Sequence, residues 1–160
     1  MSEPNLRACL KLHLADGVGA VTFRRLIEHF GDAASAASAT GYELMRVEGV
    51  GEKVADAIAA VTDEQVEAEL ADARAAGVRI LTDRDAAYPE ALRSIHDWPP
   101  VLYVRGSLED ADAVALGVVG ARRCSHYGLE QAERFGELLG RAGFTVVSGG
   151  ARCTVRNPAA

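Results

Sequence analysis

The chain has 160 residues, a hydrophobic fraction of 49% and a formal net charge of −6, which fits one ordinary domain or two small ones with a buried core. It has no run of about 20 apolar residues and no apolar stretch of the secretory-signal type at its start, so we expect a cytoplasmic protein without a membrane segment. The negative net charge argues against a wholly basic nucleic-acid binder.

The first sixty residues are predicted to form two similar helical hairpins. Gly17-Val18-Gly19 recurs 32 residues later as Gly49-Val50-Gly51, and apolar residues lie at helical spacing on both sides of each motif. The glycines permit the positive φ of a close turn, and each central valine is expected to enter the core. We therefore predict an all-α helix-hairpin-helix domain over residues 1–62.

Each hairpin is also a candidate contact for a DNA phosphate. Backbone N–H groups and the dipole at a helix N-terminus attract phosphate, and Lys53 adds a cation beside the second hairpin. The candidate contact residues are Gly17, Gly19, Gly49, Gly51 and Lys53. Glu52 opposes such a contact, and a purely architectural pair of hairpins is an equally good interpretation.

A linking helix and two short strands are predicted in the middle of the chain. The helix covers residues 63–77 and has a very acidic outer face. Strands are expected at residues 78–81 and 101–104, with a short helix around Leu92 between them. Trp98-Pro99-Pro100 favours an extended backbone before the second strand.

The last third of the chain predicts a parallel βαβ unit. Residues 113–119 and 144–147 are almost entirely apolar, which is typical of parallel strands covered on both faces. A helix is expected between them, over about residues 127–142. Its inner stripe is expected to consist of Ala132, Phe135, Gly136 and Leu139. This order is half of a doubly wound nucleotide-binding fold, so residues 78–160 are predicted to form a second domain.

Two glycine-containing loops follow these strands, at residues 120–128 and 148–152. Because parallel strands end at one edge of a sheet, both loops are expected to line one crevice, where phosphates bind in open α/β sheets. Arg122 can donate two parallel hydrogen bonds to a phosphate, and Ser125 is expected to cap the following helix. The competing interpretation is a tight turn with solvent-facing arginines. Neither loop has the dinucleotide or Walker pattern.

Metal and catalytic sites are not predicted. The three cysteines have neither the spacing of a metal site nor that of a disulfide framework, and reduced thiols are expected. The four histidines form no metal cluster, and no catalytic set of serine, histidine and aspartate is readable. We therefore expect no enzyme activity and no cofactor.

These motifs, in this order, resemble the DprA (Smf) family of DNA-processing proteins. Residues 88–106 resemble the family's segment with Tyr-Pro, Pro-Pro and Leu-Tyr pairs, and residues 118–128 and 147–152 resemble its two glycine loops. The helical N-terminal part resembles the family's SAM-like domain. The resemblance implies an α/β protein with a helix-hairpin-helix domain followed by a Rossmann-like parallel sheet.

The resemblance implies single-stranded DNA binding without catalysis, in natural transformation, with loading of a RecA-type recombinase. The DNA- and phosphate-binding residues would be Gly120, Ala121, Arg122, Ser125, Tyr127, Gly128, Ser148, Gly149 and Gly150. Ala121 stands where the family has serine, which removes one hydroxyl donor.

The resemblance ends at Arg152. The family continues with Gly-Ile-Asp and a helix, whereas this chain reads differently over residues 153–160. From this we expect a truncated, incomplete sheet, impaired strand binding and loss of the surface through which family members form homodimers. The alternatives are a phosphoribohydrolase-like enzyme and a helix-hairpin-helix DNA adaptor. The enzyme needs a glutamate near the second glycine loop, and no acidic residue follows Gly149.

Overall fold

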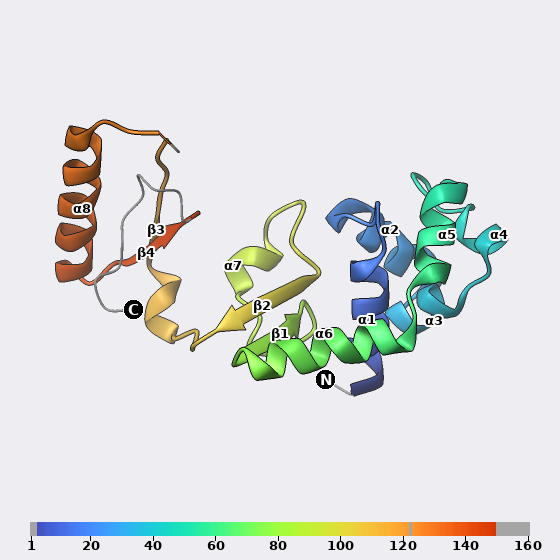
Figure 1. Ribbon diagram of the computed structural model, residues 1–160. Helices are drawn as coiled ribbons and strands as arrows, with labels where there is room; N and C mark the ends of the chain where they lie inside the picture. Colours follow the sequence, from blue (N-terminus) through green and yellow to red (C-terminus); the bar gives the residue numbers. More distant parts are fainter. Residues whose placement is uncertain (1–2, 122, 150–160) are drawn as a thin grey trace. The chain divides into compact units, whose positions relative to one another are not determined.

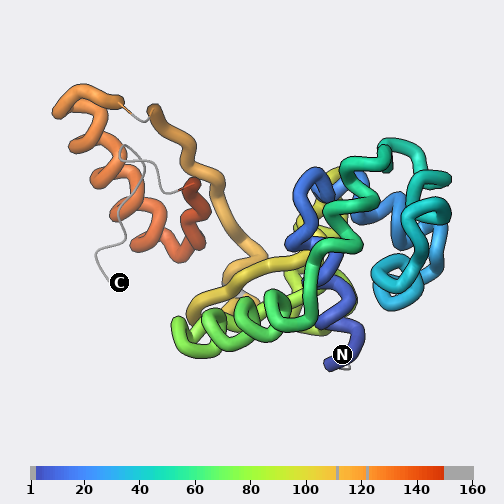
Figure 2. The backbone as a smooth tube through the Cα atoms, turned by 45° about the vertical axis from the view of Figure 1, so that its right-hand side comes forward, coloured from blue at the N-terminus to red at the C-terminus, as the bar shows by residue number. Residues whose placement is uncertain are grey.

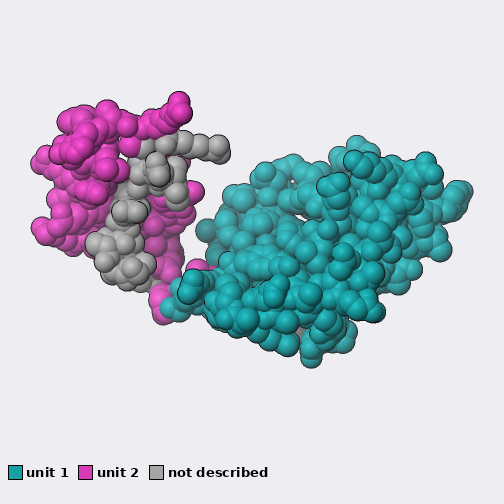
Figure 3. Space-filling model, viewed as in Figure 1, with its two compact units in different colours: residues 1–107 teal, residues 108–160 magenta. Residues whose placement is uncertain are grey.

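The computed structural model describes residues 3–121 and 123–149 (Figure 1). The chain divides into two compact units, residues 1–107 and residues 108–160 (Figure 3). The first unit contains a set of helices and a two-stranded antiparallel sheet, and the second contains a two-stranded parallel sheet with one long helix. A helical N-terminal part followed by an α/β part is the predicted fold class, which is thereby confirmed.

The helices at the start of the chain form the two expected hairpins. Helices α1 (Glu3–Leu14) and α2 (Ala20–Phe30) flank the first Gly-Val-Gly, and α4 (Gly41–Leu44) and α5 (Glu52–Ala60) flank the second (Figures 1 and 2). Helix α3 (Ala33–Ser38) connects the two hairpins and packs against both α1 and α2.

The two hairpins have the same backbone geometry. The first glycine of each motif has a positive φ, +86° at Gly17 and +87° at Gly49. The second glycine of each is extended, with φ of −85° at Gly19 and −93° at Gly51, and serves as the N-cap of the next helix. A positive φ is readily adopted by glycine, whereas it raises the conformational free energy of residues with a Cβ atom. The sequence repeat is therefore also a structural repeat.

The hairpins also pack against each other reciprocally. A Cβ placed on Gly17 would lie 3.0 Å from Cγ2 of Val54 in α5, and one on Gly49 would lie 3.1 Å from Nη1 of Arg25 in α2. Arg25 Nη1 donates a hydrogen bond to the backbone oxygen of Glu48 at 3.1 Å. The central valines of both motifs pack into the shared core. Each hairpin therefore lies against the helix that follows the other.

The rest of the first unit consists of α6 (Asp63–Ala75), the antiparallel strands β1 (Val78–Thr82) and β2 (Val101–Arg105), and the short helix α7 (Glu90–Arg93) between the strands. Val101 is buried in the same core as the helical hairpins. The first compact unit therefore includes both strands. The division into domains at residues 62 and 77 stays a prediction.

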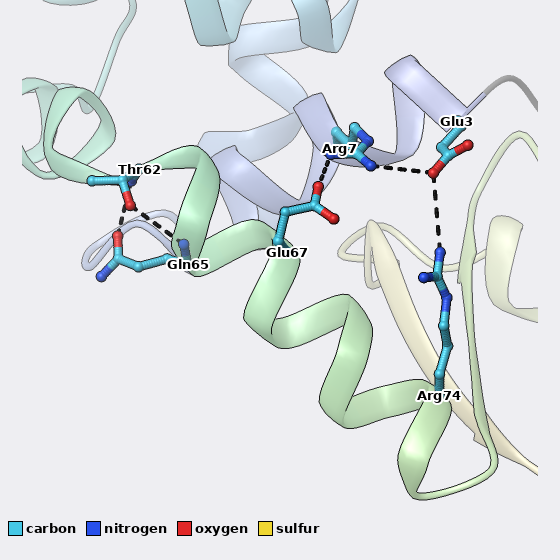
Figure 4. Close-up of polar contacts among 6 residues, drawn as sticks. All are labelled: Glu3, Arg7, Thr62, Gln65, Glu67 and Arg74. Carbon is cyan, nitrogen blue, oxygen red and sulfur yellow. Dashed lines mark hydrogen bonds and ion pairs between the residues drawn. The ribbon is translucent and has the colours of Figure 1, made fainter.

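Polar contacts fasten α6 to α1 (Figure 4). Arg7 of α1 pairs with Glu67 of α6 and also with Glu3, at 3.2 Å. Arg74, in the last turn of α6, lies 4.0 Å from the same Glu3 carboxylate. Exposed ion pairs each contribute little to stability, so the buried apolar side of α6 carries most of the attachment. The predicted linking helix is thus packed onto the hairpins.

The second unit is built as a parallel βαβ unit, as predicted. After the 3₁₀ turn η1 (Asp110–Ala113), strand β3 (Ala115–Val118) pairs in parallel with β4 (Thr145–Ser148), and α8 (His126–Arg141) connects them. The strand and helix bounds lie within a few residues of those expected from the sequence.

The apolar surface of the second unit is incompletely covered. Val119 is 94% exposed, Phe135 is 58% exposed and Val147 is 57% exposed. Of the expected inner stripe of α8, Gly136 is buried, whereas Phe135 lines the same groove as Ala132 and Leu139 but stays largely exposed. The physical reason is that two short strands are too narrow to cover the apolar face of a helix of 16 residues.

Two further expectations concern cysteines and metals. Cys9 is a buried free thiol, and burial raises its pKa to about 11. Within residues 3–121 and 123–149, no group of three or more metal-ligating side chains comes together. In the same residues, no helix has the length and apolarity needed to cross a bilayer.

Candidate nucleic-acid interface

Two loops start from paired positions at one edge of the parallel sheet. Val118, the last residue of β3, is in register with Ser148, the last residue of β4. The glycine loop after β3 and the start of the loop after β4 therefore leave the sheet side by side. Crevices beyond the carboxyl ends of parallel strands are where ligands bind in open α/β sheets.

The first loop leads directly into the N-terminus of α8. Ser125 is the N-cap, and its hydroxyl oxygen accepts a hydrogen bond from the N–H of Gly128 at 3.2 Å, as expected from the sequence. A Cβ on Gly128 would lie 3.3 Å from Cβ of Cys124, so a glycine lets the loop fold closely over the first helical turn. The positive end of the helix dipole thus faces the loop.

A groove of about 500 Å³ lies between the end of β3 and α8. The loop residues Gly120 and Ala121 line it, together with Gly128, Ala132 and Phe135 of the helix. Gly120 and Ala121 are exposed. The groove therefore has exposed loop backbone on one side and apolar side chains on another.

Three more of the predicted phosphate-binding residues, Tyr127, Ser148 and Gly149, lie in the first turn of α8 or at the end of β4. Tyr127 is 69% exposed in the first turn of α8. Ser148 ends β4 and Gly149 follows it, exposed. Arg122 and Gly150 lie outside the described residues.

The hairpin glycines belong to the first unit. Helices α2 and α5 begin at the exposed Gly19 and Gly51, and neither N-cap makes a side-chain hydrogen bond. Helices α3, α4 and α6, in contrast, all begin with a side-chain cap. An uncapped first turn leaves N–H groups for water or an anion. Lys53 is exposed in the first turn of α5, but Glu52 lies in the same turn.

A polar cluster around Arg93 was not anticipated from the sequence. Its guanidinium donates hydrogen bonds to the backbone oxygens of Asp83, at 2.9 Å, and Asp85, at 2.7 Å. It also lies 5.4 Å from the ring centre of Tyr88, and the buried Tyr88 hydroxyl donates to the backbone oxygen of Pro99 at 2.7 Å. These contacts hold the segment between β1 and β2. The Tyr-Pro pair in the sequence marks this segment, but no local pattern links it to Arg93.

Comparison with known proteins points to one family over most of the chain. Residues 3–72 match the family model of the DprA-like N-terminal HHH domain, and residues 79–154 match that of DNA recombination-mediator protein A. The chain is 32% identical over 138 residues to Protein Smf of Synechocystis sp., which covers 83% of this chain and 35% of that protein.

Two other Smf proteins match over shorter stretches. Identity to Protein Smf of Escherichia coli is 40% over 65 residues, or 41% of this chain and 17% of that protein. Identity to Protein Smf of Borreliella burgdorferi is 33% over 63 residues, or 39% of this chain and 20% of that protein. The matched part of the chain thus spans about a third of the length of the Synechocystis relative and less of the other two.

Proposed function

The chain belongs to the DprA/Smf family of DNA-processing proteins, and from this premise we propose that it binds the backbone of single-stranded DNA at the paired glycine loops of its second unit. The observation that carries the proposal is the register of Val118 with Ser148. Because of this register, two glycine-containing loops leave the sheet side by side, and the first of them leads into the N-terminus of α8. The proposed role is binding, without a catalytic step.

Each part of this edge has a role in the proposal. Gly120 and Gly149 allow a phosphate to approach the backbone closely, and the N-terminus of α8 adds its dipole. Arg122, which follows Gly120 and Ala121 in the sequence, supplies a charge-assisted hydrogen bond. Contacts of this kind position a nucleic acid but read no base sequence. They suit a protein that handles strands of any sequence.

The family membership supports a wider proposal about partners. We propose that strand binding serves natural transformation and that the protein partner is a RecA-type recombinase.

Exposed apolar side chains on β3, β4 and α8 are surface that further strands and helices of a Rossmann-like sheet would cover. Strand binding is therefore tested in a version of the chain extended by the remaining sequence of a relative.

The test is a salt titration of strand binding in the extended version, with Arg122→Ala as the variant. Fluorescence anisotropy of a labelled oligothymidylate gives the Kd at each salt concentration. Loss of one charge-assisted phosphate contact is expected to cost about 1.5–3 kcal/mol and to reduce the slope of log K against log salt by about 0.7.

The control is Arg141→Ala, which makes the same charge change in the last turn of α8. Its affinity is expected to stay close to that of the parent. Equal affinity and equal salt slope for Arg122→Ala and the parent would contradict the proposed site.

The second candidate function is DNA contact by the helical hairpins. The observation that favours it is the pair of uncapped helix N-termini at Gly19 and Gly51. Here Lys53→Ala should weaken duplex binding by the first unit, whereas Lys11→Ala, on α1, should not. If neither lysine matters, the hairpins are architectural.

A further inference from the structure

A cavity of about 260 Å³ lies inside the first unit, where the helical hairpins meet the segment between β1 and β2. Cys9 of α1 and Phe23 and Arg24 of α2 line its helical side. Arg84 and Trp98 line it from the segment between the strands. The cavity has no part in the proposed phosphate contacts, since the glycine loops belong to the second unit.

The wall formed by the inter-strand segment is held in place by polar contacts. Arg24 donates a hydrogen bond to the backbone oxygen of His96. The Tyr88 hydroxyl donates to the backbone oxygen of Pro99, and Arg93 donates to that of Asp83. Small-molecule sites are usually concave and largely formed in advance. This cavity has that character.

The lining combines aromatic, cationic and acidic side chains. Its members that bear on ligand chemistry are Phe23, Trp98, Arg24, Arg84, Glu28 and Asp83. Arg24 lies 3.7 Å from Glu28, so these two charges offset each other. Burial raises the pKa of the Asp83 carboxyl, and the charges of Arg84 and Arg93 oppose the rise. The cavity is thus lined by two arginines and two carboxylates, whose charges balance. Such a lining favours neither an anionic nor a cationic ligand.

The size and the walls of the cavity further restrict the class of ligand that can bind. Sites for small molecules usually measure about 300–1,000 Å³, so 260 Å³ is room for a single heterocycle and not for a whole nucleotide. A nucleobase has two apolar faces for aromatic and aliphatic walls, and an edge that both donates and accepts hydrogen bonds. The protonated Cys9 thiol, Ile27 and Phe23 supply uncharged walls.

We propose that this cavity binds a nucleobase, with Trp98 and Phe23 among its apolar walls and Asp83 and Arg84 hydrogen-bonded to the base edge. The inference rests on the proposed function for the source of the base, which is a nucleotide of a bound single strand. Base contact of this kind would add to backbone contact elsewhere on the same strand.

The chain offers a direct probe, because Trp98 is its single tryptophan. We would titrate the 160-residue chain with 2′-deoxyadenosine, 2′-deoxyguanosine, 2′-deoxycytidine and thymidine, and follow tryptophan emission. The base-free control is 2-deoxyribose. A saturable change with at least one deoxynucleoside and none with deoxyribose is expected. No saturable change with any of the four, or an equal change with deoxyribose, would overturn the proposal.

A variant tests the assigned edge contact. Asp83→Asn keeps the size of the side chain and is expected to weaken deoxynucleoside binding by about tenfold. The matched control is Asp97→Asn, which removes a carboxylate next to Trp98 in the sequence but outside the cavity lining. If Asp83→Asn proves less stable than the parent, Arg84→Gln takes its place with the same expected loss. Parental affinity in a correctly folded variant would overturn the assignment.

A separate anisotropy measurement of strand binding distinguishes a failure of the cavity site from a failure of the proposed strand-binding function. Binding of a strand without any response to deoxynucleosides would overturn the cavity site alone. Binding of deoxynucleosides by a chain that, even in its extended version, does not bind strands would support the cavity site and overturn the strand-binding function.

Discussion

The two units differ in how completely they cover their apolar surface. In the first, helices from both hairpins close around a core in which Leu10, Leu12 and Leu26 are fully buried. In the second, two strands and one helix leave Val119 and Phe135 largely in water. Apolar surface left wet costs about 25 cal/mol per Å² relative to burial. We infer that the first unit supplies most of the stability, while the second carries the glycine loops.

The difference between the units also shows what fixes a site. Strand register alone aligns Val118 with Ser148, so the two loops meet at one edge even though the sheet around them is open. The position of the loops is set by a few backbone hydrogen bonds. Their rigidity depends on cover that the described strands do not provide.

The largest expected contrast comes from the same substitution in each unit. Leu26→Ala removes a side chain with 0% exposure and is expected to lower the free energy of unfolding by about 2–5 kcal/mol. Leu138→Ala, in α8, removes one that is 52% exposed and is expected to change it by less than about 0.5 kcal/mol. Urea unfolding followed by far-ultraviolet circular dichroism measures both. Similar losses in the two variants would show that the two units do not differ in how they bury their leucines.

The hairpins show where sequence reasoning works well. A repeated Gly-Val-Gly predicts a turn because a positive φ is a local demand that glycine meets, and both hairpins have it. The N-cap of α3 follows an equally local rule, because the Asp32 carboxylate accepts a hydrogen bond from the N–H of Ser35 at 2.7 Å. Local rules of this kind need no knowledge of the rest of the fold.

A smaller effect is expected at the hairpin glycines of the first unit. Gly17→Ala places a Cβ at a φ of +86° and 3.0 Å from Val54, and is expected to cost about 1–3 kcal/mol. The matched variant Gly19→Ala has φ of −85° and meets no atom within 4 Å. It is expected to cost less than about 1 kcal/mol. Equal losses in thermal unfolding would show that the turn does not need its glycine.

Contacts between segments far apart in the chain could not be predicted from the sequence. Nothing local pairs Arg25 with Glu48 or Arg24 with His96, because these contacts depend on how the hairpins and the inter-strand segment pack. The exposure of Phe135 was missed for the same reason: helical spacing predicts which residues share a face, but not whether anything covers that face. The cavity beside Trp98 is likewise a product of packing.

The smallest expected effect is a pH dependence confined to the first unit. Burial lowers the pKa of His13, in the last turn of α1, and Glu69 opposes this shift. A lowered pKa in the folded state means that folding favours the neutral form of the imidazole. The contribution of His13 to the free energy of unfolding is therefore full above about pH 6.5 and declines as the pH falls toward the pKa of the folded state.

We therefore expect the urea concentration at the midpoint of unfolding of the unmodified chain to decrease as the pH is lowered from 7.5 to 5. His13→Gln should show a smaller fall. A parental slope in His13→Gln would remove His13 as the cause.

We infer that the well-covered first unit supplies most of the stability, whereas the glycine loops lie on the less covered two-stranded parallel sheet. Hydrogen exchange of a monomeric sample, read at single amides by NMR, tests it most directly. We expect the amides of Val118, Val146 and Val147 to exchange at least about tenfold faster, relative to their unprotected rates, than those of Leu12 and Leu26. Equal protection in the two units would show that the two-stranded parallel sheet is stable by itself and would contradict this inference.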